Sequence, residues 1–343
     1  MASCGADGRT VPAGDFGTGE RKDGALMLRP VEKGIANLEC MASVLTAHAE
    51  KDSSIIVVTS DSRSSGKVSG FARQFPRQLV EVGIAEQDSV GISAGLASCN
   101  KKVFTVSPGS FLSARALEQV KNDVAYSQNP VALIGISSGV SYGGLGATHH
   151  SIHDLAVLQA IPGLEVIVPA DNNETEAALV SYLENPRPVY IRFGKKAMPR
   201  FYQAPGEVKI GKVSVLNEGD DLLILAIGEP LWPAYDAAVA LESSGVRCSL
   251  ASVHTLCPID RDTIIELASH SRGIITVEEH SVYGGLGSTV AALLMEAGIY
   301  RPMKIIGFPR EEMVTGSQAD LFRHYGIDAE NIRKTAMDLL NRN

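Results

Sequence analysis

Residues 55–59 read Ile-Ile-Val-Val-Thr (IIVVT), a run in which apolar and polar residues do not alternate. Similar short runs recur along the chain, with helix-like stretches between them. Unalternating apolar strands are typical of a parallel sheet that helices cover on both faces. The sequence therefore predicts an α/β fold. Its first part has predicted strands at 55–59, 78–82, 103–106, 131–136, 165–168 and 189–193, and helices at 114–127 and 171–184.

A second α/β series follows a stretch rich in lysine and proline. Residues 195–215 contain Lys195, Lys196, Pro199 and Pro205, which is the composition of an interdomain linker. We therefore expect two consecutive open α/β domains: a disordered leader (1–27), a first domain (28–195), a linker (196–215) and a second domain (216–343). The second domain has predicted strands at 222–227, 246–253, 273–277 and 303–306, and helices at 233–244, 260–270, 288–297 and 330–340.

Composition narrows the class of protein. The chain has 343 residues, of which 45% are hydrophobic and 20% charged, so it can build a core and is not mainly disordered. Its net charge of -8 gives no long-range attraction to nucleic acid or to an anionic membrane. No apolar run approaches the ~18 residues of a membrane helix. The five cysteines are scattered without a CxxC pair, which argues against a disulfide framework or a zinc site. We expect a soluble, cytoplasmic protein.

Two polar clusters could carry chemistry, although the 33 glycines form no nucleotide-binding signature. Glu86 lies between a predicted strand and a helix, at the sheet edge where open α/β folds bind ligands. From spacing alone, a carboxylate that supports the helix dipole is the better interpretation. His149, His150 and His153 form the second cluster. Adjacent histidines point apart in regular structure, so hydrogen bonding or proton transfer to a substrate suits them better than a metal.

An ordered set of motifs then resembles the C-terminal half of the transketolase family. They are VGIAEQ (82–87), AGLA (94–97), Ser110-Phe111, GATHHSIHDLA (146–156), IPGLEVIVPAD (161–171), VYIRFGKKAMP (189–199) and VEEHSVYGGLGS (277–288). The resemblance implies a thiamine-diphosphate pyrimidine-binding domain followed by a transketolase C-terminal domain.

The family's diphosphate-binding motif, GDG…N, does not occur in this sequence. The resemblance therefore implies one subunit of a split enzyme. A separate N-terminal subunit with the GDG…N motif would hold Mg²⁺ and most of the diphosphate, and this chain would supply no metal ligand. The implied assembly is an α2β2 heterotetramer in which this chain also pairs with its own copy.

The resemblance assigns roles to particular residues. Glu86 matches the glutamate that bonds the pyrimidine ring nitrogen and exchanges a proton with it. Phe111 matches an aromatic ring that stacks on the pyrimidine, although the family's two further aromatics are Ala114 and Leu117 here. His149 matches a histidine that faces substrate oxygens. Asp61 matches an acidic loop residue near the subunit interface and the cofactor.

The departures from the family pattern concern the substrate. Leu145 stands where transketolases usually carry an Asp that contacts a substrate hydroxyl. The positions matching the family's phosphate site are Asn37, Lys195, Ser65 and Ser137, with Arg63 or Lys67 as possible replacements for a lost cation.

We therefore expect transfer of a two-carbon ketol unit from a ketose, phosphorylated or otherwise anionic, to an aldehyde acceptor. One alternative is a β subunit of a thiamine-diphosphate carboligase or dehydrogenase acting on a 2-oxo acid. The other is a non-catalytic regulatory homologue.

Overall fold

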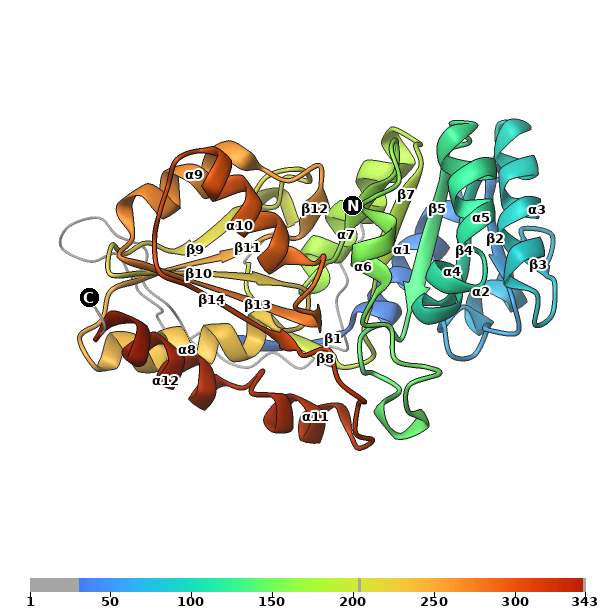
Figure 1. The fold of residues 1–343 in the computed structure, drawn as a ribbon. Coiled ribbons are helices and arrows are strands. Elements are labelled where there is room, and N and C mark those ends of the chain that lie inside the picture. The colour runs from blue at the N-terminus through green and yellow to red at the C-terminus, as the bar shows by residue number, and fades with distance from the viewer. Residues whose placement is uncertain (1–30, 203–204, 342–343) are drawn as a thin grey trace, which may run out of the picture.

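The computed structural model describes residues 31–202 and 205–341, and the leader predicted over 1–27 lies outside this range. The described residues form two α/β domains side by side, which confirms the predicted fold class (Figure 1). The elements are β1 (Glu32–Ala36), α1 (Asn37–Ala49), β2 (Ile55–Thr59), α2 (Ser69–Gln74), β3 (Leu79–Glu81), α3 (Glu86–Ser98), β4 (Lys102–Pro108), α4 (Gly109–Ala114), α5 (Leu117–Gln119), η1 (Val120–Tyr126), β5 (Val131–Ile136), η2 (Gly143–Leu145), α6 (Asp154–Leu158), β6 (Glu165–Ile167), α7 (Asn172–Glu184), β7 (Val189–Arg192), β8 (Ala197–Arg200), η3 (Pro205–Glu207), β9 (Ser214–Asn217), β10 (Leu222–Ile227), α8 (Leu231–Ser243), β11 (Cys248–Ser252), β12 (Thr255–Cys257), α9 (Arg261–His270), β13 (Gly273–Ser281), α10 (Leu286–Glu296), β14 (Met303–Phe308), α11 (Gln318–Tyr325) and α12 (Ala329–Leu340).

The first domain is built on a seven-stranded sheet in the order β12-β6-β7-β5-β4-β2-β3. Its strands run parallel except for β12. Side chains of α1, α2 and α7 form the core on one face, and those of α3, α4, η1 and α6 form it on the other. The strand order reverses at β2, because β3 follows on one side of it and β4 on the other. Open α/β sheets bind ligands at the carboxyl ends of strands beside such a reversal.

The second domain has a five-stranded sheet in the order β14-β13-β10-β11-β9, with β9 antiparallel to β11 and the other pairs parallel. Helices α8 and α12 lie on one face of this sheet, and α9 and α10 on the other (Figure 1). Strand β13 continues to Ser281, past the predicted end at residue 277. This extension places the buried residues Glu278, Glu279 and His280 at the carboxyl end of the strand.

The connection between the domains contains strands of its own, and one strand of the second domain joins the first sheet. The segment predicted as a linker, residues 196–215, contains β8, which pairs antiparallel with β1, and β9 begins in it. Strand β12, which follows β11 of the second sheet, pairs with β6 at the edge of the first sheet. The two domains therefore share a sheet edge as well as a covalent connection.

The helix predicted over 114–127 is wrong in its start and its geometry. Helix α4 begins at Gly109, and the chain then forms the short α5 and the π-helix η1. Both Arg115 N–H (2.9 Å) and Ala116 N–H (3.2 Å) donate to the Phe111 carbonyl, which widens the turn at the junction. Such widened turns are often found at functional sites.

Helix α7 begins with part of a capping box, in which Asp171 is the cap and Glu174 lies three residues later. Asp171 accepts a hydrogen bond from Glu174 N–H at 2.9 Å, as a helix cap should. The Glu174 carboxylate accepts from Ala170 N–H at 2.6 Å, one residue before the expected partner.

Among the described residues, no helix is long and apolar enough to cross a membrane.

Candidate active site

Glu81, at the end of β3, organises the sheet edge where the strand order reverses. Its carboxylate accepts hydrogen bonds from the Thr59 hydroxyl (2.8 Å) and from the N–H groups of Asp61 (2.7 Å) and Gly83 (3.2 Å). Burial acts to raise the pKa of Glu81, but these hydrogen bonds and the nearby Arg63 outweigh it and lower the pKa below the ordinary value. One ionised carboxylate thus ties the loop after β2 to the loop that leads into Glu86.

Glu86 is the first residue of α3, and only 1% of its surface is exposed. Its carboxylate accepts a hydrogen bond from Arg115 Nη1 at 2.5 Å. Arg115 itself is far more exposed, with 46% of its side chain accessible. A buried carboxylate at a helix N-terminus whose partner reaches in from the surface is well placed to exchange that partner for a ligand.

Aromatic and cationic side chains continue from Glu86 in a chain of contacts. The Arg115 guanidinium lies over the Phe111 ring, 4.8 Å from its centroid. The Phe111 and His149 rings meet edge to face at 5.3 Å, and Tyr142 meets His149 at 5.7 Å. Lys195 Nζ then lies 4.3 Å from the Tyr142 centroid. We call these six residues, Glu86, Arg115, Phe111, His149, Tyr142 and Lys195, the contact row.

The contact row unites four of the residues that the sequence singled out: Glu86, Phe111, His149 and Lys195. They come from α3, α4, the loop of residues 137–153 between β5 and α6, and the turn after β7. These segments follow β3, β4, β5 and β7, which run parallel in one sheet, so the carboxyl ends of these strands lie at one edge.

The other predicted site residues stand apart from the contact row. Within residues 31–202 and 205–341, no hydrogen bond, ion pair or ring contact joins Asp61, Ser65, Ser137 or Leu145 to it. Ser65 Oγ donates to the Ser62 carbonyl at 3.2 Å. Ser137 has a positive φ of 51°, and its buried hydroxyl has no hydrogen-bond partner in the described part of the chain. Leu145 is 57% exposed in η2. Their roles stay predictions.

Most residues considered for an anion site already have partners. Asn37 accepts a hydrogen bond from Asn172 Nδ2 at 2.9 Å and is buried, so it serves the contact between α1 and α7. Arg63 pairs with Glu81 at 3.2 Å, and Lys67 pairs with Glu39 at 3.3 Å. Lys195 is exposed and contacts the Tyr142 ring, which leaves its ammonium group open to an anion.

The neighbouring histidines point in different directions. His149 faces the Phe111 and Tyr142 rings, and its Nδ1 lies 2.9 Å from Thr148 Oγ1. His150 is buried, and its Nε2 lies 3.2 Å from the Gly143 carbonyl oxygen. In the part of the chain that the structure describes, no three His, Cys, Asp or Glu side chains are grouped as metal ligands.

Sequence reasoning missed Arg115 and Tyr142 as site residues. Arg115 lies four residues after Phe111, and residues at this spacing share a face of a helix. That signal was available, but the predicted helix began at residue 114 and separated the two. Tyr142 had no such signal, because its contact with His149 depends on the path of the 137–153 loop.

The residues of the contact row fit an aminopyrimidine ring on one condition. Phe111 offers a ring face, and the Glu86 carboxylate beside it can accept a hydrogen bond. The planar, hydrogen-bond-donating Arg115 guanidinium occupies both positions. Since nearly half of this side chain is exposed, it can turn outward and release Glu86 and Phe111 to a ligand.

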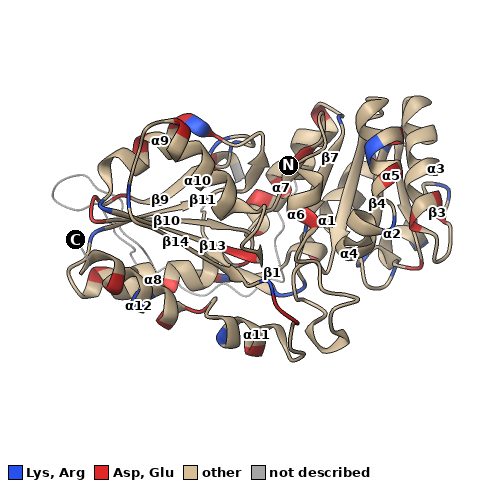
Figure 2. Ribbon diagram, viewed as in Figure 1, with Lys and Arg blue, Asp and Glu red and all other residues tan. Residues whose placement is uncertain are grey.

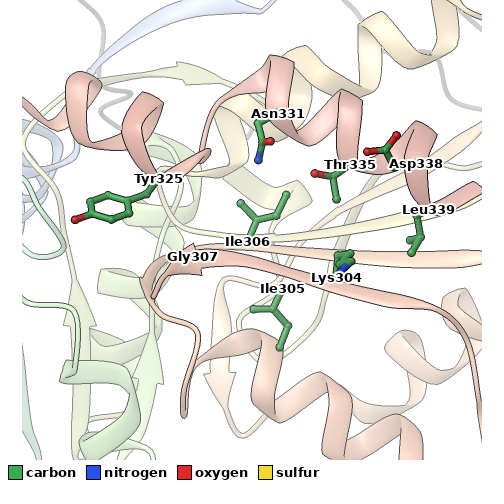
Figure 3. A pocket seen from close by; sticks show the side chains of 9 residues that line it. All are labelled: Lys304, Ile305, Ile306, Gly307, Tyr325, Asn331, Thr335, Asp338 and Leu339. Carbon is green, nitrogen blue, oxygen red and sulfur yellow. The ribbon is translucent and has the colours of Figure 1, made fainter. Parts of the chain in front are cut away.

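A separate cavity of about 310 Å³ lies in the second domain, between β14 and α12. Figure 3 shows Asn331 and Thr335 of α12 above Ile306 of β14, with Asp338 and Lys304 near one end. Its lining shares no residue with the contact row, and nothing in it indicates a particular ligand.

Comparison with known proteins identifies similar domains. The family model described as "Transketolase, pyrimidine binding domain" matches residues 33–200, and that described as "Transketolase, C-terminal domain" matches residues 211–332.

Curated relatives match over most of this chain. An apulose-4-phosphate transketolase subunit of Phocaeicola vulgatus is 44% identical over 309 residues, which are 90% of this chain and 98% of the relative. A 6-deoxy-6-sulfo-D-fructose transketolase subunit of Clostridium sp. is 33% identical over 299 residues, covering 87% of this chain and 92% of the relative.

A solved structure described as a split gene transketolase, an inactive beta4 tetramer, is similar with a TM-score of 0.82 and 32% identity. The match covers 90% of this chain and 99% of that one.

Proposed function

Because this chain belongs to the transketolase family as one subunit of a split, two-chain transferase, we propose that it serves transfer of a two-carbon ketol unit. The donor would be a ketose with an anionic end, and the acceptor an aldehyde. The single observation that carries this proposal is the contact row, in which a buried carboxylate, an aromatic ring, a histidine and a lysine adjoin at one sheet edge.

Thiamine diphosphate, on which the family depends, would supply an electron sink for the carbon that is transferred. Glu86 would hold and exchange a proton at a pyrimidine nitrogen, and the Phe111 ring would pack against the pyrimidine. The diphosphate and Mg²⁺ would be held mainly by a partner subunit with a GDG…N motif. The domain division 28–195, 196–215 and 216–343 and the α2β2 assembly belong to the same proposal.

His149 and Lys195 would act on the substrate. The imidazole lies between two aromatic rings that restrict its orientation, so it would present one nitrogen to a substrate oxygen and move a proton there. Lys195 would bind the anionic end of the ketose. The names of two relatives, which specify a phosphate and a sulfo group, support an anionic substrate here. Asp61 would lie near the cofactor and the subunit interface, and Ser65 and Ser137 would help to bind the anionic end of the substrate.

Reconstitution tests the proposal. The chain would be combined with its GDG…N partner, thiamine diphosphate and Mg²⁺, and assayed with apulose 4-phosphate, 6-deoxy-6-sulfofructose and pyruvate, each with an aldehyde acceptor. We expect ketol transfer from at least one of the two anionic sugars and none by the chain alone. Carbon dioxide release from pyruvate without sugar turnover would favour the 2-oxo acid alternative, to which the apolar, exposed Leu145 points.

A further inference from the structure

The 137–153 loop, which carries Tyr142, Leu145 and His149, is closed on itself at its base. Ser151 N–H donates to the Gly139 carbonyl at 2.7 Å, and the two residues form an isolated antiparallel bridge. The loop is also bound from the second domain. Ser281 N–H donates to the Ile152 carbonyl at 2.9 Å. Residues at the substrate side of the site are therefore held from a domain that contributes none of the contact row.

Glu279 of the second domain binds the loop close to its base. Its Oε1 accepts a hydrogen bond from Val140 N–H at 3.0 Å, and its side chain is 1% exposed. Gly139 has a φ of 63°, and a Cβ built there would lie 2.1 Å from the Glu279 carboxyl carbon. A glycine is therefore needed for the loop to approach this carboxyl group. Figure 2 shows acidic residues at the end of β13 that lies toward the first domain.

Glu229, just before α8, makes the matching contact with the turn after β7. A Cβ at Gly194 would lie 1.8 Å from Glu229 Oε1, and the Lys196 backbone donates a hydrogen bond to this carboxyl group. Gln318 joins the two acids, because its Nε2 donates to Glu229 Oε2 at 2.6 Å and to Glu279 Oε1 at 2.7 Å. One acid thus holds the loop of His149, and the other holds the turn of Lys195.

Arg192 completes the connection from the first domain. Its Nη2 donates to the carbonyl oxygens of Ser151 (3.1 Å) and Glu279 (2.8 Å), while its Nε bonds Asp154 at 2.8 Å. Burial, aided by the adjacent Glu229, raises the pKa of Glu279 to about 8 despite Arg192. Val140 N–H and Gln318 Nε2 both donate to Glu279 Oε1, so the carboxyl group acts here as a hydrogen-bond acceptor, which the amide oxygen of a glutamine can imitate.

We propose that Glu279 is a positioning residue, which holds the 137–153 loop so that Tyr142 and His149 face the substrate, and that Glu229 does the same for Lys195. The catalytic part of this inference rests on the proposed function. The physical part, that the second domain restrains the loop, does not depend on which substrate is used.

Hydrogen exchange on the complex with the partner subunit tests the physical part. In Glu279→Ala, the amide of Val140 loses its buried acceptor, so we expect about tenfold faster exchange in the peptide spanning 138–152. Peptides from α3 should be unchanged. Glu278→Ala is the matched control, since the neighbouring Glu278 accepts from Leu286 and Gly287 N–H in its own domain. Equal exchange of the loop in Glu279→Ala and in this control would overturn the proposal.

Gly139→Ala tests the same contact from the loop side and keeps the test open if Glu279→Ala does not fold. Its methyl group would displace the Glu279 carboxyl, so loop exchange should also rise.

Kinetics test the catalytic part with apulose 4-phosphate. We expect KM to rise about tenfold in Glu279→Ala, affinity for thiamine diphosphate to stay within about twofold, and Glu279→Gln to restore KM. Faster loop exchange with an unchanged KM would overturn the positioning role, and absence of sugar turnover in the wild type would count against the proposed function alone.

Discussion

Arg115 shows how a single side chain can prepare a ligand site. It pairs with the buried Glu86 carboxylate and covers one face of the Phe111 ring. Without it, the carboxylate would have no charged partner and the ring would be more exposed. Its planar donor group matches the shape and polarity that we expect of the ligand. Cofactor binding would therefore exchange one pair of contacts for another, with little rearrangement of the backbone.

Replacing Arg115 by Met should change stability and cofactor affinity in opposite directions. The isolated chain should lose about 1–3 kcal/mol of unfolding free energy, because Glu86 loses its charged partner. Thiamine diphosphate should bind the complex more tightly, because Arg115 no longer competes for Phe111 and Glu86. Urea unfolding measures the first effect and titration calorimetry the second. Weaker cofactor binding in this variant would show that Arg115 contacts the cofactor directly.

Replacing Glu86 by Gln should lower kcat of the reconstituted enzyme at least about a hundredfold, because proton exchange at this position is lost. Gln keeps the shape and still accepts from Arg115, so the circular dichroism spectrum and assembly with the partner should not change. Asp88→Asn, an exposed change in the same helix turn, is the control. Near-normal turnover in Glu86→Gln would remove Glu86 from its proposed role.

At the scale of elements, the short strand β12 connects the second domain to the first sheet. It contributes three residues to the edge of the first sheet, yet Leu256 at its centre is only 2% exposed and packs in a core cluster that contains residues of both domains. The edge of β6 is therefore covered by the second domain, which protects it from pairing with other chains.

Leu256→Ala should lower the free energy of unfolding by about 2–5 kcal/mol, the usual cost of a cavity at a fully buried leucine. Because the core is shared, both domains should unfold in one transition in the wild type. Met295→Ala, a 63% exposed position on α10, should cost less than about 0.5 kcal/mol. Calorimetry of the three proteins checks these values, and two separate transitions in the wild type would contradict the shared core.

Elements with a strong local signal were predictable from the sequence. The apolar runs at 55–59, 131–136 and 222–227 match β2, β5 and β10 residue for residue, because burial on both faces leaves no other pattern. Strand β12 and the π-helix η1 were not predicted, since each depends on contacts distant in sequence. In the site, spacing put Glu86 at the right sheet edge but favoured a helix-dipole role, and the family resemblance was needed to assign it to the cofactor. Tyr142 and Glu279 required the path of a loop and the packing of two domains.

At the scale of the whole molecule, buried acids link stability to pH. Burial raises the pKa of Glu278 to about 7 and, with Glu229, that of Glu279 to about 8. Their ordinary value is 4.5, so the folded chain binds protons that the unfolded chain has lost between these pH values. The stability contributed by each group is complete below its ordinary pKa and disappears as pH rises through the folded one.

Burial also lowers the pKa of His254 and His280 from 6.5 to about 4, which raises stability with increasing pH between these two values. Above pH 6.5 this opposite effect has ended, so stability should fall from there to about pH 8, with a slope of up to about 1.4 kcal/mol per pH unit for each such acid. Glu279→Gln removes one titrating group and should make the slope shallower, while a control at the exposed Glu330, Glu330→Gln, should leave it unchanged. Urea unfolding at several pH values measures the slopes. Equal slopes in wild type and Glu279→Gln would show that Glu279 titrates normally.

The pairing of β12 with β6 also bears on how genes of this kind can be recombined. A chimera that exchanges everything after residue 216 between two relatives would exchange one strand of the first sheet along with the second domain. Its success would depend on how well the new β12 matches the old β6, and not only on the junction. A crossover placed after residue 257 would instead keep the first sheet within a single parental sequence.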